Sequence, residues 1–238
     1  MLTVDFSRLK LRQDSRVLDA GCGTGRHLSE AFRREGVLVV GVDMSLEDST
    51  TAMNTLQIME QEGEGGNGSW GVFKGDITRL PFSDGSFDLV ICSEVLEHIP
   101  EDSKAVSEIT RVLKPGEVAV VSVPRFFPES ICWALSKSYR NEPGGHVRIY
   151  RRRRLIELLE GAGLTCEHTH WAHALHSPYW WLKCLVGTKK ENSRLVNLYH
   201  RFLVWDIVKH PWLTRTMERL LNPLIAKSSV FYFRKKGK

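Results

Sequence analysis

The stretch Arg16-Val-Leu-Asp-Ala-Gly-Cys-Gly-Thr-Gly25 is a short apolar run that ends in three glycines, and a helical pattern with Leu28, Ala31 and Phe32 follows it. Glycines allow a backbone to approach a ligand closely, and the start of a helix offers free N–H groups. The stretch therefore predicts a strand, a ligand-binding turn and a helix, in that order. A glycine turn alone is also common without a ligand.

Further apolar runs of similar length repeat through the first half of the chain, at 37–42, 70–74, 87–92 and 117–123. Helix-compatible segments lie at 46–62 and 102–113. Buried strands that alternate with helices predict a doubly wound α/β fold, in which helices cover both faces of a parallel sheet. In such sheets, ligands bind beyond the carboxyl ends of the strands.

Acidic residues stand at three of these strand ends. Asp19 precedes the glycines, Asp43 ends the second run, and Asp76 follows the third. A carboxylate at Asp43 could accept hydrogen bonds from both hydroxyls of a ribose, and Asp76 could accept one from an exocyclic amine. The sequence thus predicts a nucleoside-binding edge.

Several segments together carry a family resemblance: Val17–Gly25, Asp43, Gly75-Asp-Ile77, Pro81-Phe-Ser-Asp-Gly-Ser-Phe-Asp-Leu-Val90, Leu96-Glu-His98 and Leu113-Lys-Pro-Gly116. They resemble class I S-adenosylmethionine-dependent methyltransferases, and most closely the small-molecule group (methyltransferase type 11) that includes ubiquinone and menaquinone biosynthesis enzymes. The resemblance covers roughly residues 16–166. One departure is Glu117, where a second glycine is usual. The resemblance implies a Rossmann-like sheet of seven strands whose last strand is antiparallel.

The resemblance also assigns the methionyl end of the cofactor. Gly21, Gly23 and Gly25 would pack against this part of S-adenosylmethionine, whose product is S-adenosylhomocysteine. Asp19 would face its amino group, directly or through water.

The nucleoside and the methyl donor are assigned in the same way. The resemblance implies that Asp43 holds the ribose, that Asp76 holds the adenine amine and that Ile77 packs on the adenine ring. Ser93 and Glu94 would line the site beside the methyl donor.

A nicotinamide dehydrogenase is the nearest competing interpretation, because it also has glycines and an acid after the second strand. Its fingerprint is GxGxxG, whereas this chain has GxGxG with Arg26 at the next position. Asp19 also stands where that fold prefers an apolar residue. A protein that binds the cofactor without catalysis is the other alternative.

Methyl transfer mainly needs an acceptor aligned with the S–CH3 bond, so a general base is optional. Candidates for acceptor-side roles are His98, after the fourth strand, and His146 and Tyr150 in the segment 144–150. Each could equally serve local packing or hold the loop. The sequence leaves the acceptor atom, O, N or C, open.

A metal is a further hypothesis. Glu94, Glu97 and His98 form an ExxEH pattern, and His146 follows downstream. Some quinone-pathway and small-RNA methyltransferases with a similar arrangement bind a divalent ion, and these donors suit Mg2+, Mn2+ or Zn2+. The same string is common in relatives without a metal, so the ligand set stays open.

The second half of the chain differs in charge and composition. Residues 1–124 hold 12 Lys and Arg against 20 Asp and Glu, whereas residues 125–238 hold 21 against 8. The alternating segments 164–171 and 229–234 predict the last two strands. The 56 residues between them, 172–227, are too long for an irregular loop and have helical apolar spacing. They predict a helical lid inserted into a single methyltransferase domain, residues 1–238.

The lid interleaves tryptophans with lysines and arginines, which suits packing on the domain itself, a membrane interface, lipid contact or a second subunit. We expect methyl transfer to a small acceptor that could be apolar or lipid-linked. RNA methylation by the basic half is the alternative, and the lack of a separate RNA-binding motif argues against a nucleic-acid partner.

Five scattered cysteines, and no visible signal peptide or spanning segment, predict a cytoplasmic location, with the membrane surface as a further site.

Overall fold

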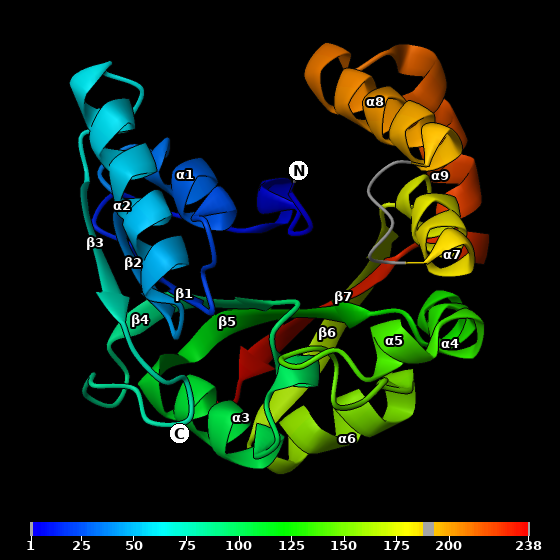
Figure 1. Ribbon diagram of the computed structural model, residues 1–238. Coiled ribbons are helices and arrows are strands. Elements are labelled where there is room, and N and C mark those ends of the chain that lie inside the picture. Colours follow the sequence, from blue (N-terminus) through cyan, green and yellow to red (C-terminus); the bar gives the residue numbers. More distant parts are fainter. Residues whose placement is uncertain (1, 188–192, 238) are drawn as a thin grey trace.

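The computed structural model describes residues 2–187 and 193–237, which form a seven-stranded mixed sheet with helices on both faces (Figure 1). The strand order is β3-β2-β1-β4-β5-β7-β6. The strands are β1 (Arg16–Ala20), β2 (Leu38–Asp43), β3 (Ser69–Lys74), β4 (Phe87–Ser93), β5 (Leu113–Pro124), β6 (Leu164–Ala172) and β7 (Ser228–Lys235). The first five are parallel, and β7 runs antiparallel to both of its neighbours. This confirms the predicted α/β methyltransferase-like sheet with an antiparallel last strand.

Alternate residues of the central strands build two cores, one on each face of the sheet. Leu18 and Val90 pack toward α3 (Asp102–Val112) and α6 (Arg152–Gly161). Their neighbours in sequence pack the other way, toward α1 (Arg26–Phe32) and α2 (Leu46–Gln61). Because strand side chains alternate between faces, apolar runs such as 87–92 are explained by burial on both sides.

The start of β5 differs from the expected strand. The sequence predicts a helix to residue 113 and a strand from Glu117, whereas α3 ends at Val112 and β5 begins at Leu113. Leu113 is fully buried and pairs with Phe87, and the register then shifts before Leu89. Gly116, with a φ of 80°, provides the left-handed conformation near this irregularity.

Between β6 and β7 the chain forms α7 (His176–Val186), α8 (Arg194–Lys209) and α9 (Trp212–Ile225), which stand opposite α1 and α2 in Figure 1. α7 packs on α4 (Phe126–Leu135), which follows β5 and precedes the short α5 (Lys137–Arg140). The Trp181 indole donates to the Pro128 carbonyl at 3.0 Å. The Arg125 guanidinium donates to two carbonyls at the end of α9. These contacts hold the three helices beyond the carboxyl end of β5.

The N-terminal segment joins the two sides of the molecule. The Thr3 backbone N–H donates to His27 Nε2 of α1 at 3.3 Å, and the Thr3 hydroxyl lies 3.3 Å from His173 Nε2, after β6. Thr3 is buried, and Phe6 packs in the core beside α1. No motif in this short segment predicts the contact.

Two further observations concern the cysteines and the possibility of a membrane-spanning helix. All five cysteines are free, and four of them are buried. Among the described helices, none combines the length and the apolar character needed to cross a bilayer.

Candidate active site

The glycine turn after β1 has an open backbone at its centre. Gly21, Gly23 and Gly25 all have positive φ angles, of 84°, 50° and 85°, which favour glycine. A Cβ on Gly21 would lie 2.4 Å from a Val95 methyl, and one on Gly25 would lie 2.9 Å from the Ala52 Cβ. A Cβ on Gly23 would meet no atom within 4 Å. The turn is thus packed at its ends, while its middle faces space that a ligand could fill.

Asp43 ties this turn to the end of β2. Its Oδ2 accepts the Gly23 N–H at 2.8 Å, and its Oδ1 accepts the Ser45 N–H at 2.9 Å. Each carboxylate oxygen keeps a second lone pair, so Asp43 can still accept two hydroxyl groups. The structure brings together the glycine turn and the acid that the sequence predicted as ribose ligand.

The Asp76 loop lies beside Asp43, because the Gly75 N–H donates to the Asp43 carbonyl at 2.8 Å. Asp76 is exposed, and its Oδ1 accepts the Thr78 N–H. The Ile77 side chain is buried in the core cluster over α3 and α6. An adenine contact for Asp76 and Ile77 therefore stays a prediction, and Asp76 is the freer of the two side chains.

Asp19 is the least satisfied carboxylate at this edge. It is 1% exposed, and neither oxygen has a hydrogen-bond partner among the described residues. Burial raises its pKa to about 8, and Asp43 adds to the rise, while Arg26 opposes it. His27 lies 4.0 Å away, but burial lowers its pKa to about 3, so this ring supplies no positive charge near neutral pH.

An ammonium group would fit beside Asp19, because it brings both a positive charge and N–H donors to a buried carboxylate that lacks them. The amino group of S-adenosylmethionine is such a group, and the open Gly23 backbone, which Asp43 binds from the end of β2, lies on the turn that follows Asp19. These residues fit the cofactor that the sequence implied.

Ser93 and Glu94 form a hydrogen-bonded chain at the end of β4. Ser93 Oγ lies 2.8 Å from Ser122 Oγ on β5, and that hydroxyl donates to Glu94 Oε1 at 3.0 Å. Glu94 has a φ of 59°, a costly conformation for a residue with a side chain. Burial raises the Glu94 pKa, and Lys227 opposes the rise. Strain and burial at a strand end are common features of functional sites.

His98 and His146 come together from distant segments, with ring centroids 4.8 Å apart. His98 Nδ1 lies 2.9 Å from the Gly144 carbonyl, and His146 Nδ1 lies 2.7 Å from Glu129 Oε1. Because carbonyl and carboxylate oxygens only accept, both Nδ1 atoms act as donors. In neutral rings, both Nε2 atoms are then free to accept a proton or bind a metal.

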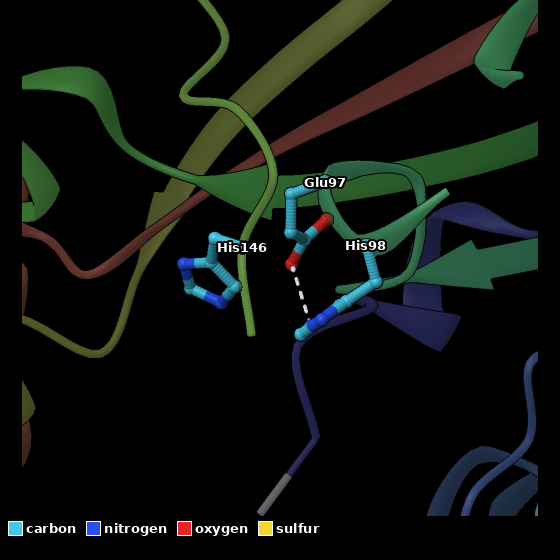
Figure 2. A group of neighbouring side chains, drawn as sticks. All are labelled: Glu97, His98 and His146. Carbon is cyan, nitrogen blue, oxygen red and sulfur yellow. Dashed lines mark ion pairs between the residues drawn. The ribbon is translucent and has the colours of Figure 1, made fainter. Parts of the chain in front are cut away.

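Glu97 completes this cluster (Figure 2), and its Oε1 lies 4.0 Å from His98 Nε2. It is fully buried, neither oxygen has a hydrogen-bond partner among the described residues, and burial and Glu94 raise its pKa. Ligand atoms of Glu97, His98 and His146 lie within 4.8 Å of one another, so these three could hold a divalent ion. The carbonyl and carboxylate behind the two rings resemble the outer partners of metal-binding histidines.

Tyr150 has a different position from the two histidines. Its hydroxyl donates to Asp102 Oδ2 at 2.6 Å, and the side chain is 4% exposed in the core. Arg148 lies beside it and donates to the Leu96 carbonyl at 3.2 Å. These bonds hold the short helix Leu96–His98 against α3, which is the packing role weighed for Tyr150 in the sequence.

Two residues of the acceptor side carry no sequence signal. Glu129 is 1% exposed and binds His146 through one oxygen and Lys227 through the other, at 3.2 Å. Burial alone would raise the Glu129 pKa, but His146 and Lys227 outweigh it and lower the pKa to about 2. Glu129 lies on α4 and Lys227 in the connection between α9 and β7, and neither belongs to a motif.

Comparison with known proteins agrees with this geometry. The methyltransferase domain family matches residues 3–169. The sterol 24-C-methyltransferase of Yarrowia lipolytica is 30% identical over 77% of this chain and 48% of its own length. The ubiquinone biosynthesis O-methyltransferase of Alkalilimnicola ehrlichii is 35% identical over 50% of this chain and 46% of its own. The chain thus spans about half the length of the curated relatives that it matches.

A solved structure supports the fold. Geranyl diphosphate methyltransferase in complex with S-adenosylmethionine matches with a TM-score of 0.64, over 97% of this chain and 82% of its own, at 12% identity. At this identity the likeness concerns the architecture alone.

Proposed function

The chain belongs to the class I S-adenosylmethionine-dependent methyltransferases, and we propose that it transfers a methyl group to a small acceptor that is apolar or lipid-linked. One observation carries the proposal: the Asp19 carboxylate, which has no hydrogen-bond partner among residues 2–187 and 193–237, lies next to a glycine turn that Asp43 binds. When bound, S-adenosylmethionine supplies an activated methyl group on a sulfonium. The residues around it need to bind the cofactor, orient the acceptor and exclude water.

At the cofactor end, we propose that Asp19 binds the amino group, that Asp43 accepts the ribose hydroxyls and that Asp76 accepts from the adenine amine. Gly21, Gly23 and Gly25 keep side chains away from the ligand. Such positioning supplies much of the rate acceleration in an in-line displacement.

At the acceptor end, His98 and His146 are our candidates for removing a proton. Each Nδ1 is fixed by a carbonyl or a carboxylate, and neither Nε2 forms a hydrogen bond with another described residue. An acceptor that loses its proton early would need such a base, whereas another would need alignment alone. A divalent ion on Glu97, His98 and His146 is the second way in which this cluster could orient an oxygen acceptor.

The nature of the acceptor is inferred from the helices between β6 and β7. We propose that residues 172–227 act as a lid over the acceptor side, because α7 packs on α4 and Lys227 reaches Glu129. The two relatives, a sterol and a ubiquinone biosynthesis methyltransferase, favour a small apolar acceptor over RNA.

Calorimetry with S-adenosylhomocysteine tests the cofactor site. We expect binding to the wild type, strong loss in Asp43→Ala, and no change in Glu60→Gln, a matched removal of charge on the exposed side of α2. Binding by Asp43→Ala equal to that of the wild type would contradict the assigned site.

Transfer of a labelled methyl group tests the acceptor class. After incubation with a total lipid extract, we expect the label in the organic phase. After a separate incubation with total RNA, we expect none in the RNA. Label in RNA alone would contradict a small apolar acceptor, and binding of cofactor without transfer to either would favour a non-catalytic protein.

A further inference from the structure

Helix α9 turns an apolar stripe toward solvent. Leu213, Met217, Leu220 and Leu224 follow the spacing i, i+4, i+7 and i+11, which puts them on one side of a helix. All four are exposed, and Leu220 is 71% exposed. In a globular domain, such a stripe normally faces the core. Trp212, at the start of the helix, is 77% exposed.

Helix α8 has a second outward stripe. Leu195, Leu198, Phe202 and Trp205 follow the spacing i, i+3, i+7 and i+10, and the first two are each 65% exposed. With Leu182 of α7, three of these residues line a shallow apolar groove. Monomeric soluble proteins rarely expose large contiguous apolar patches unless something covers them. We call the outward stripes of α8 and α9 the apolar face.

Positive charge borders the apolar face. Arg194, Arg201, Lys209 and Arg219 are exposed, and none of them forms an ion pair with another described residue. The carboxylates of α8 and α9 point inward, because Asp206 and Glu218 both bind Arg215, which links the two helices. Among the described residues of 172–227, the exposed charges are therefore all positive at neutral pH.

We propose that the apolar face docks the protein on an anionic lipid surface. Leucines would enter the boundary between headgroups and acyl chains, tryptophans would lie at that boundary, and the arginines and lysine would meet lipid phosphates. A second copy is a poorer occupant. A two-fold dimer places the same patch on itself, so that unpaired arginines would face arginines.

Docking in this orientation would also bring the acceptor side of the site near the bilayer. α9 leads through Lys227 into β7, and Lys227 binds the Glu129 that holds His146. A lipid-linked acceptor could then pass from the bilayer to the acceptor side without crossing water. This last step rests on the proposed function, whereas docking itself does not.

Flotation with vesicles tests docking without any cofactor. The wild type should bind vesicles of phosphatidylcholine with phosphatidylglycerol at low salt, and pure phosphatidylcholine at least about tenfold more weakly. Leu220→Asp should reduce binding about tenfold or more. Ile58→Asp is the matched control, because Ile58 is 58% exposed on α2, in the cofactor half. It should bind like the wild type.

The charge is tested separately by Arg201→Glu with Arg219→Glu. This pair should lower binding to anionic vesicles and flatten its dependence on salt, since screening acts on the same contacts. Thermal melting shows whether each variant is folded.

Absence of wild-type binding at low salt, or equal binding by folded Leu220→Asp, overturns the proposal. A wild-type dimer that Leu220→Asp converts to a monomer, without vesicle binding, shows a second copy instead. Calorimetry with S-adenosylhomocysteine separates the two proposals, because docking can fail while cofactor binding persists, and the reverse.

Discussion

Two buried carboxylates at opposite ends of the proposed site, Asp19 and Glu129, have opposite surroundings. At the cofactor end, Asp19 has no hydrogen-bond partner within the described part of the chain, and burial raises its pKa to about 8. At the acceptor end, Glu129 is equally buried but holds both His146 and Lys227. The first carboxylate suits a positive charge that arrives with a ligand, whereas the second already has one within the fold. The first is thus built for binding and the second for organising the fold around the site.

Removing the internal cation should have the largest effect on stability. Lys227→Met removes the cation that faces the buried Glu129 carboxylate, and breaking a buried ion pair typically costs about 3–5 kcal/mol. We expect the free energy of unfolding in urea to fall by that order. Lys183→Met is the control, since Lys183 is half-buried over Trp180 and forms no ion pair with another described residue.

The double variant Lys227→Met with Glu129→Gln should recover part of this loss, because the unpaired charge is then removed as well. If the double variant is as unstable as the sum of both single variants, then Glu129 and Lys227 are not coupled as the structure shows.

At the cofactor end, removing charge should have the opposite effect on stability. Asp19→Asn should weaken binding of S-adenosylhomocysteine by roughly 30-fold or more, equivalent to about 2 kcal/mol for a charged hydrogen bond. It should also raise the melting temperature of the ligand-free protein at pH 8, because a buried charge without partners is destabilising. Calorimetry and thermal melting measure the two effects on the same sample.

The gain in stability should itself depend on pH. The pKa of Asp19 is about 8 in the folded chain, against an ordinary value of about 3.9 when unfolded. The folded chain therefore binds more protons between these values, so its free energy of unfolding falls as pH rises from about 4 to about 8. The advantage of Asp19→Asn should vanish near pH 4 and be complete above pH 8. An equal advantage at both pH values would contradict the raised pKa.

The contrast also explains what the sequence could predict. Gly21, Gly23, Gly25 and Asp43 act through local turns and neighbouring strand ends, so strand order and motif spacing were enough to bring them together. The hydrogen bond from the Gly23 N–H to Asp43 requires only that β1 and β2 are neighbours in the sheet. Likewise, the sheet followed from apolar runs whose alternation with helices allows few topologies.

The acceptor end depends on contacts that no local pattern encodes. Glu129 meets Lys227 only because α4 and the end of α9 pack beyond β5. The approach of His98 to His146 was anticipated only by the metal hypothesis, which grouped both with Glu94 and Glu97 on a family resemblance and not on a local pattern. The lid prediction found helical spacing in 172–227 but not the direction of its apolar stripes, since packing partners decide which face is buried.

Binding of the cofactor product should follow the ionisation of Asp19. An ammonium ligand favours the charged carboxylate, so affinity for S-adenosylhomocysteine should rise with pH by up to about tenfold per unit below pH 8, and then level off. Calorimetry from pH 6 to pH 8 measures this slope. Asp19→Asn supplies the control and should give a flat profile over the same range. If the wild-type profile is equally flat, then Asp19 does not bind the amino group of the ligand.

The smallest effect is expected for Tyr150, and it tests the difference between Tyr150 and His146 at the acceptor end. Tyr150→Phe removes the short hydrogen bond to Asp102 and two longer ones, with Leu96 at 3.4 Å and Arg148 at 3.3 Å. Asp102 is partly exposed, so the free energy of unfolding should fall by about 1 kcal/mol. Methyl transfer should fall far less than in His146→Gln, because the Tyr150 hydroxyl is engaged with the start of α3, whereas His146 presents a free Nε2. Urea unfolding and initial rates of methyl transfer measure the two quantities. A folded Tyr150→Phe variant with a loss of rate equal to that of His146→Gln would place Tyr150 in the reaction and not in the scaffold.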